Sequence, residues 1–325
     1  MTAGREAVSR DRRFGRWLGA AMLGTALAAA AVCAVLLIDP WGWFNASPEA
    51  AVEAGSFPGV EAPPLLPPAE PVSPSPFNVL ILGLDHGAGR PQQGNERSDV
   101  MMVAHVDESK GRACLLSIPR DSYVPVPGHG TRKINEAYPL GGPELAVETV
   151  ELLTGLEIRN YVVMDFDEFA WLVDLFGGVR VTLEKPIMDP KLGIIPAGSQ
   201  LLDGEHALIM ARSRDYPEGD LERARQQQRL ITQALYKGKD LAGSPGAAWF
   251  LSVALERLET DLTRDEVIRL AREFAAFPVV DVQGGLLPGR NGAAGGASVY
   301  FVDREATREL VYSLESACSI PPQYR

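Results

Sequence analysis

The sequence predicts an α/β fold, an αβα sandwich with a central mixed sheet, preceded by one transmembrane helix. From Phe77 onward, short apolar runs typical of buried strands alternate with longer amphipathic runs typical of helices. Upstream, residues 17–38 form an uncharged apolar run of 22 residues. A proline-rich stretch separates the two parts. Together these observations predict a globular domain held at a membrane by one helix.

Charge and length predict the role of the N-terminal segments. Residues 1–16 carry five arginines against one Glu and one Asp, a net charge of +3, and are expected to form a cytoplasmic tail. At about 1.5 Å per residue, residues 17–38 cover roughly 33 Å, the thickness of one hydrocarbon core. We therefore expect a single-pass protein of the cell membrane, with a cytoplasmic N-terminus and an extracytoplasmic main domain. A cleaved signal peptide is the alternative, but its apolar stretch is usually only about 7–15 residues long.

Residues 39–76 are expected to form a linker. Nine prolines fall between residues 45 and 76, and they favour an extended chain with partial polyproline II character. At residue 77 the composition changes from proline-rich to runs of apolar residues. Residues 77–316 are therefore expected to form one domain, and residues 317–325 a C-terminal tail.

Within this domain, the apolar runs predict strands at residues 77–85, 100–106, 113–119, 161–166 and 179–183. The helical pattern covers residues 143–153, 167–175, 203–210, 221–237, 263–274 and 303–314. Asp167 is the expected N-cap of the second helix, and Gly238 the expected end of the fourth. That fourth helix carries an apolar stripe that faces either the core or a ligand, and packing on the core is the favoured interpretation: Leu221, Ala224, Ile231 and Leu235.

Composition excludes several classes of protein. The formal net charge of −11 argues against a nucleic-acid partner, because such proteins carry clustered positive charge. Three cysteines are too few for a disulfide-dense scaffold, and no CxxC, HxH or HExxH spacing is present to bind zinc. No Walker A, GxSxG or post-strand GxGxxG motif occurs, so the usual modes of nucleotide binding are unsupported. Any metal site must use carboxylates.

Two carboxylates flank the loop after the first predicted strand. Asp85 closes that strand, and Asp99 lies just before the next one. Ligands often bind where strands open onto a loop, and Mg²⁺ takes one or two carboxylates together with phosphate oxygens. Equally, Asp85 can cap a turn, and Asp99 can cap a helix or pair with Arg97.

Cationic and amide side chains lie where apolar runs begin or end, in five separate segments. Guanidinium groups bind phosphate with two parallel hydrogen bonds, so this pattern indicates a phosphate site. For any single arginine, a surface salt bridge is the simpler interpretation. In the last segment, Arg223 and Gln227 are four residues apart and share a helix face, whereas Arg225 lies well round the helix. The whole set is Arg120, Asp121, Lys133, Asn135, Arg212, Arg214, Arg223 and Gln227.

At these segments the sequence resembles the LytR-CpsA-Psr (LCP) family of cell-wall glycopolymer ligases. The matching stretches follow the family's order across residues 77–240: FNVLILGLD, RSDVMM, LLSIPRDSYV, KINEAY, YVVMDFDEFAWLVDLFGGVRV, LLDGEHALIMARSRD and GDLERARQQQRLI. The resemblance implies that residues 77–316 are an extracytoplasmic LCP-like catalytic domain. One departure is visible: Gln226 stands where the family often has arginine, and Arg225 precedes it, which leaves the roles of these two positions open.

The resemblance also implies an activity and its partners. Such a phosphotransferase moves a glycopolymer from a polyprenyl-pyrophosphate carrier to a cell-wall acceptor hydroxyl, usually on peptidoglycan, next to the membrane. By matching positions, Asp85 and Asp99 would hold Mg²⁺. The implied catalytic residues are Arg120, Asp121, Arg212 and Arg214, and the implied substrate-binding residues are Lys133, Asn135, Arg223 and Gln227. The general base is either Asp121 or a metal-held carboxylate.

Two alternative functions use the same residues. A non-catalytic binder or sensor of anionic lipid or polymer would need no Mg²⁺, and a pyrophosphate-ester hydrolase would transfer to water. A transcription regulator is disfavoured, since a 16-residue cytoplasmic tail is too short for a helix-turn-helix. Outside the cytoplasm, Cys114 and Cys318 are also compatible with a disulfide.

Overall fold

The computed structural model of the chain describes residues 76–85, 96–189, 193–213, 220–242, 253–267, 269 and 281–325. All of them fall within one compact unit, Val72–Arg325. The predicted cytoplasmic tail, the predicted transmembrane helix and nearly all of the predicted linker lie outside the described residues. Within the described part, no helix combines the length and the apolar character needed to cross a membrane.

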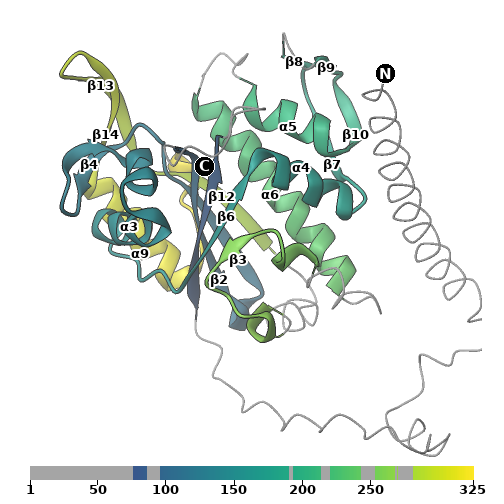
Figure 1. Ribbon diagram of the computed structural model, residues 1–325, viewed down its shortest axis with the longest axis horizontal. Helices are drawn as coiled ribbons and strands as arrows, with labels where there is room; N and C mark the ends of the chain where they lie inside the picture. The colour runs from purple at the N-terminus through teal and green to yellow at the C-terminus, as the bar shows by residue number, and fades with distance from the viewer. Residues whose placement is uncertain are drawn as a thin grey trace, which may run out of the picture. The chain divides into compact units, whose positions relative to one another are not determined.

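A mixed sheet of six strands lies at the centre, in the order β11-β6-β1-β2-β3-β12 (Figure 1). Pairs β1–β2, β2–β3 and β6–β11 are antiparallel, whereas β1–β6 and β3–β12 are parallel. The mixed sheet predicted from the sequence is thus confirmed. Its strands are β1 (Phe77–Leu84), β2 (Ser98–Asp107), β3 (Arg112–Ser117), β6 (Asn160–Asp165), β11 (Glu259–Thr260) and β12 (Asp281–Leu286).

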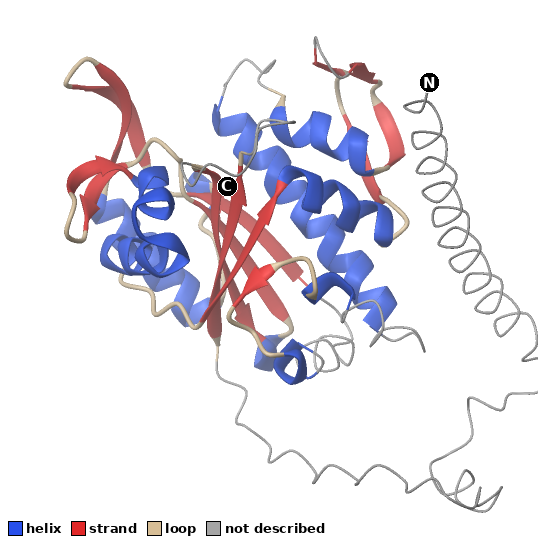
Figure 2. Cartoon of the chain, in the orientation of Figure 1, coloured by secondary structure: helices blue, strands red, loops and turns tan. Residues whose placement is uncertain are grey.

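Helices pack on both faces of this sheet (Figure 2). Strand side chains alternate between the faces, so that Leu80 and Leu82 lie in one core cluster and Ile81 contacts another. The first cluster includes buried residues of α3 (Ala137–Thr154) and α9 (Arg304–Ala317). Against the second, α6 (Asp220–Ala242) packs Ile231 and Leu235. Continuous apolar strands are therefore explained by burial on both sides.

A separate apolar cluster includes Leu230 of α6. Its other residues come from α4 (Phe166–Leu175), α5 (Gly204–Arg212), β7 (Val179–Leu183), β8 (Ile187–Asp189), β9 (Gly193–Ile195) and β10 (Gly198–Leu202). Helices α4 and α5 approach closely at Gly204, where a Cβ atom would stand 2.2 Å from the Ala170 carbonyl oxygen. The N-cap of α4 is Asp165, in a capping box with Glu168, so the prediction of Asp167 was wrong by two residues.

Two hairpins complete the described chain. They are β4 (Tyr123–Val126) with β5 (Gly130–Lys133), and β13 (Gly289–Ala294) with β14 (Ala297–Val302). Neither hairpin was predicted from the sequence. In the second hairpin, β13 is rich in Gly and Ala and lacks the alternating apolar pattern that predicts a strand. The second hairpin is fastened to the segment after β3: Tyr300 pairs with Ser122, and its backbone N–H donates to the Asp121 carbonyl at 2.8 Å.

Helix boundaries differ from prediction at two places. Backbone angles at Gly141 and Gly142 break α3, so its regular part begins at Pro143, as expected. Helix α6 continues through Gly238 to Ala242, so Gly238 does not end it. Of the helix predicted at residues 263–274, residues 264–267 are helical and most of the remainder lies outside the described residues.

Candidate functional site

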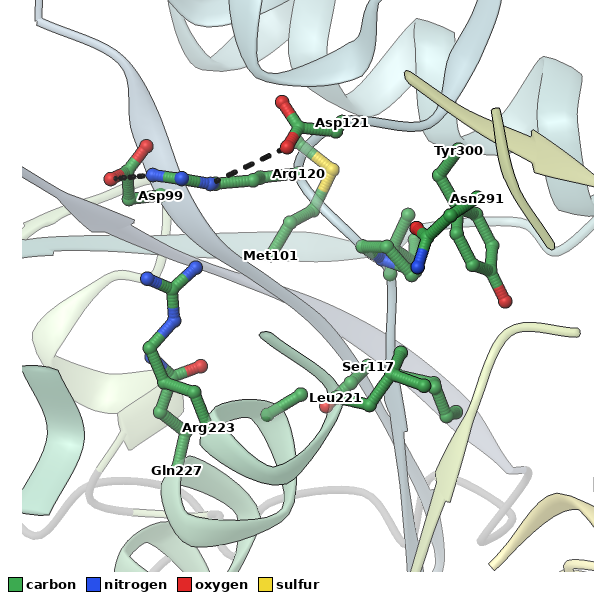
Figure 3. A pocket seen from close by; sticks show the side chains of 14 residues that line it. Asp99, Met101, Ser117, Arg120, Asp121, Leu221, Arg223, Gln227, Asn291 and Tyr300 are labelled. Atoms are coloured by element: carbon green, nitrogen blue, oxygen red, sulfur yellow. Dashed lines mark hydrogen bonds and ion pairs between the residues drawn. The ribbon is translucent and has the colours of Figure 1, made fainter. Parts of the chain in front are cut away.

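A pocket opens where several strands of the central sheet end. Strands β1, β3, β6 and β12 point the same way, so their carboxyl ends meet at one edge of the sheet. The lining comes from this edge, from the first turns of α6 and from the β13–β14 hairpin (Figure 3). It comprises Asp99, Met101, Ser117, Ile118, Pro119, Arg120, Asp121, Leu221, Arg223, Ala224, Gln227, Leu286, Asn291 and Tyr300.

A β-bulge places Asp99 in this pocket. The β1–β2 register passes from Gly83 opposite Val100 to Leu84 opposite Ser98, which leaves Asp99 as the extra residue. A bulge bends its strand and re-aims the side chain that it carries. At the bulge Val100 lies over Gly83, where a Cβ atom would stand 2.7 Å from the Val100 Cβ. Glycine is needed at residue 83 for this close approach.

Opposite charges alternate along one side of the pocket. The Asp99 carboxylate accepts a hydrogen bond from Arg120 Nη1, and Arg120 Nε lies 3.9 Å from Asp121 Oδ2 (Figure 3). Lys133, the last residue of β5, donates from Nζ to Asp121 Oδ1 at 2.7 Å. Asp121 is thus held at its carboxylate by β5 and at its carbonyl by β14. Two fixed acids and two fixed cations therefore lie in one row.

The first turns of α6 supply a further cation to the pocket. Arg223 and Gln227 both line the pocket, as their four-residue spacing on one helix face allows, and Arg223 is only 6% exposed. Gln227 Nε2 donates to the Ala211 carbonyl at 3.0 Å, which ties α6 to the end of α5. Arg225 does not line the pocket and pairs with Glu222 at 3.2 Å. The departure from the family pattern at residues 225–226 therefore lies outside the pocket wall.

Two of the remaining candidate residues, Asp85 and Arg212, lie outside the pocket lining. Asp85 is exposed, and its backbone N–H donates to the Arg97 carbonyl at 3.2 Å. Arg212 ends α5 with its guanidinium 4.9 Å from the centre of the Phe166 ring. Arg214 lies outside the described residues. The pairing of Asp99 with Arg97 that the sequence left open is not found, because Asp99 instead binds Arg120.

Asn135 supports the turn that carries Arg120. It is buried, and its backbone N–H donates to the Arg120 carbonyl at 3.2 Å. Among the described residues its side-chain Oδ1 has no hydrogen-bond partner. Asn135 and Lys133 therefore stand behind the pocket wall, where they fix Arg120 and Asp121 in place.

Part of the pocket wall was not predicted from the sequence. Leu221 and Ala224 were expected to pack on the core, but they line the pocket, and only the later Ile231 and Leu235 reach the sheet. Asn291 and Tyr300 come from the unpredicted hairpin, and no local pattern marks them. Burial raises the pKa of Tyr300 to about 12, and its hydroxyl donates to the Leu287 carbonyl at 2.9 Å. The Tyr300 hydroxyl thus stays protonated, and the side chain forms part of the pocket wall.

The described residues include no group of three or more His, Cys, Asp or Glu side chains placed to hold a metal ion. The two carboxylates assigned to Mg²⁺ by resemblance stand at the same end of the β1–β2 ladder, one just beyond β1 and one at its bulge. Carboxylate oxygens of this kind suit Mg²⁺, which takes its other ligands from water and phosphate.

A family model matches residues 67–316, and its description is the LytR_cpsA_psr family. This chain belongs to that family. Solved LytR_cpsA_psr structures share its fold. The structure titled "TagT bound to LIIa-WTA" is 26% identical with a TM-score of 0.63, covering 76% of this chain and 93% of that one. TagV of B. subtilis is 27% identical with a TM-score of 0.64, covering 75% and 98%.

Curated relatives carry names that describe a transferase or a role in the cell wall. The Enterococcus faecalis protein named "Polyisoprenyl-teichoic acid--peptidoglycan teichoic acid transferase TagU" is 35% identical over 206 residues, 61% of this chain and 66% of that protein. The Corynebacterium glutamicum "Probable cell wall biosynthesis protein LcpB" is 39% identical over 181 residues, 52% and 42% of the two chains. The matched region thus spans less than two thirds of either relative.

Proposed function

We propose that this LytR_cpsA_psr protein is a membrane-anchored phosphotransferase. It moves a glycopolymer from a polyprenyl-pyrophosphate carrier to a hydroxyl of the cell wall, with peptidoglycan as the acceptor. The observation that carries the proposal is the convergence of Arg120, from the turn after β3, and Arg223, from α6, on one pocket beside Asp99 and Asp121. The TagU relative, whose name describes this type of transfer, supports it.

The cationic side of the pocket suits a pyrophosphate. The acceptor oxygen forms a bond to the phosphorus on the glycan side, and the bond from that phosphorus to the bridging oxygen breaks. Polyprenyl phosphate leaves with the bridging oxygen. Negative charge builds up on the phosphoryl oxygens and on the leaving phosphate during this step. Arg120 and Arg223, already fixed by their neighbours, stabilise that charge without reorganising.

The other side of the pocket suits the acceptor. Asn291 stands across the pocket from Arg223 (Figure 3), and its amide both donates and accepts hydrogen bonds without carrying charge. A neutral sugar hydroxyl fits such a group better than a phosphate does. Asp121 lies beside Arg120 and is linked to β14 through Tyr300, and it accepts the proton of the attacking hydroxyl.

Mg²⁺ is the proposed cofactor, held by Asp85 and Asp99. The ion would neutralise phosphate charge at the end of β1, beside the arginines. The same proposal places the protein at the cell membrane, with residues 17–38 as a single span, the N-terminus in the cytoplasm and the described domain outside. A substrate carried by a lipid would then meet the pocket near the bilayer.

Substitution of Arg223 tests the cationic site. Arg223→Ala and Arg120→Ala should each lower transfer from a polyprenyl-pyrophosphate glycan by about 10²–10³-fold, since each removes a cation that stabilises the transition state. The matched control is Arg225→Ala, two residues along α6 and outside the pocket lining, which should retain the wild-type rate. Thermal unfolding checks that the variants fold. Wild-type rates from both pocket variants would disprove this site.

Chelation separates a transferase from a binder. EDTA should abolish product formation and Mg²⁺ should restore it, while binding of the lipid-linked glycan persists through the arginines. Products are then compared with and without peptidoglycan fragments. Glycan bound to the fragment supports transfer. Glycan released equally in both samples would identify a hydrolase, and no product under any condition would identify a binder.

A further inference from the structure

Two cysteines meet on the face of the sheet that α9 covers. Cys114 lies in β3 and Cys318 directly follows α9, and each side chain is fully buried. Their Sγ atoms are 3.2 Å apart, although the residues are separated by 204 positions in the chain. A disulfide requires an S–S distance of about 2.05 Å, so only a small approach of the two sulfurs would form one.

The C-terminal tail is built to hold Cys318 at this place. Cys318 is the C-cap of α9 and adopts a left-handed conformation with φ 42°, which turns the chain back toward the sheet. Beyond it, the Ile320 backbone N–H donates to Gln283 Oε1 at 3.0 Å, and Arg325 Nη2 donates to the same oxygen at 3.1 Å. Gly285 leaves space for Ile320, since a Cβ there would stand 2.6 Å from Ile320 Cγ2.

The surroundings of the pair favour an S–S bond over a metal site. Within the described residues, no third His, Cys, Asp or Glu completes a metal-binding group around the two thiols. The contact polarises the thiols in opposite directions: the hydrogen bond to Cys318, together with burial, raises the pKa of Cys114, and the same hydrogen bond lowers the pKa of Cys318.

We propose that Cys114 and Cys318 form a disulfide that fastens the C-terminal tail to the central sheet. The Sγ–Sγ bond forms by exchange with the disulfide of an exported thiol oxidoreductase. The two cysteine thiols are oxidised, the S–S bond of the partner breaks, and its two sulfurs take up the two protons. Because both cysteines are buried in the folded chain, the exchange takes place before α9 packs. The oxidising compartment is part of the function proposed above.

The bond would brace the edge of the sheet that carries the pocket. β3 carries Cys114 and leads into the turn that holds Arg120. β12, which pairs with β3 and is held by the tail, ends at the pocket residue Leu286. A cross-link that closes so long a loop removes much of the conformational freedom of the unfolded chain. The tail would then unfold only together with the sheet.

Peptide mass mapping tests the bond directly. The full-length chain is isolated from the membranes of an exporting bacterial host, denatured, alkylated with iodoacetamide and digested with trypsin. We expect a linked pair of peptides, residues 113–120 with 309–325, which separates after reduction into two alkylatable peptides. Cys33, the third cysteine of the chain, is the internal control and should be alkylated in both samples. Alkylation of all three cysteines without reductant would overturn the proposal.

Thermal unfolding tests the consequence. Reduction with dithiothreitol in denaturant, followed by refolding in its presence, should lower the unfolding midpoint of the wild-type chain by roughly 5–15 °C. It should leave the midpoints of Cys114→Ala, Cys318→Ala and the double variant unchanged, and the three variants should unfold at similar temperatures. Equal midpoints for the oxidised chain and the chain reduced in denaturant and refolded in dithiothreitol would contradict the bond. Neither readout uses turnover, so a linked but inactive protein would refute the proposed transfer and leave the disulfide intact.

Discussion

Asp99 and Arg120 set the character of the site at the residue scale. Their side chains are 15% and 19% exposed, so the ion pair is partly shielded from water and fixes the guanidinium in one place. Asp121, held by Lys133, lies on the other side of Arg120. The pocket therefore presents oriented charges before any substrate arrives, which is the condition for electrostatic stabilisation of a phosphoryl-transfer step.

Asn291 provides a residue-scale prediction about the acceptor. Asn291→Ala should raise the KM for the acceptor about tenfold, the cost of one lost hydrogen bond of roughly 1.4 kcal/mol, because the amide is proposed to bind the incoming hydroxyl. The KM for the lipid-linked donor should not change, since the phosphates are bound across the pocket. Steady-state kinetics with each substrate varied in turn measures both values.

Ser298→Ala is the matched control on the other strand of the same hairpin, outside the pocket lining. An equal effect of the two changes on both substrates would indicate that the hairpin acts only through stability. A donor-specific effect of Asn291→Ala would place the phosphates, rather than the acceptor, at this wall.

At the scale of elements, β1 and β2 are joined by a buried polar pair as well as by their ladder. His105 Nδ1 lies 2.8 Å from Asn78 Oδ1, and Asn78 Nδ2 donates to the Glu157 carbonyl at 2.8 Å. His105 Nε2 is buried and has no hydrogen-bond partner among the described residues. A neutral ring with its proton on Nδ1 satisfies Asn78. A second proton, on Nε2, would be a buried donor without an acceptor.

This pair predicts how stability depends on pH. Burial lowers the pKa of His105 from its ordinary value of 6.5, against the opposing attraction of Asp107. As the pH falls below about 6.5, the unfolded chain takes up the proton first, so the stability present above that pH is progressively lost. The unfolding midpoint should therefore decrease between pH 7 and pH 5.5. His105→Gln, which does not titrate, should reduce this decrease, whereas the same change at exposed His129 should not.

On the scale of the whole molecule, the described core lies within a single compact unit, Val72–Arg325. Its core clusters use residues from the sheet and from the helices on both sides of it. The unit therefore contains its own core, as an independently folding domain requires. We expect the predicted transmembrane anchor to hold the domain at the membrane and not to contribute to its stability.

Removal of the first 71 residues tests that expectation. A chain that starts at Val72 should unfold at the same midpoint as the full-length chain in detergent, because its core is complete. Transfer from a carrier embedded in vesicles should fall by about 10²-fold, since the anchor no longer concentrates the enzyme at the bilayer. Transfer from a short-chain, water-soluble carrier should be unchanged. Equal losses with both carriers would show that the removed segment contributes to the site itself.

Much of the fold follows from local sequence. The runs that form β1, β2, β3 and β6 are apolar because both faces of the sheet are covered, and this signal is contained in each run by itself. The spacing of Arg223 and Gln227 is equally local, since four residues along a helix return to the same face. For the same reason, the boundaries that depend on caps were off by only a few residues.

Only the tertiary structure decided which of the candidate residues share a wall. The bulge that carries Asp99 depends on the register between two strands, and the placement of Asn291 depends on a hairpin docked against the turn after β3. Arg212, equal to Arg120 in the sequence pattern, instead stacks on Phe166. The periodicity of a helix or strand determines the face on which a residue lies. Which segment packs against that face depends on contacts between residues far apart in the sequence.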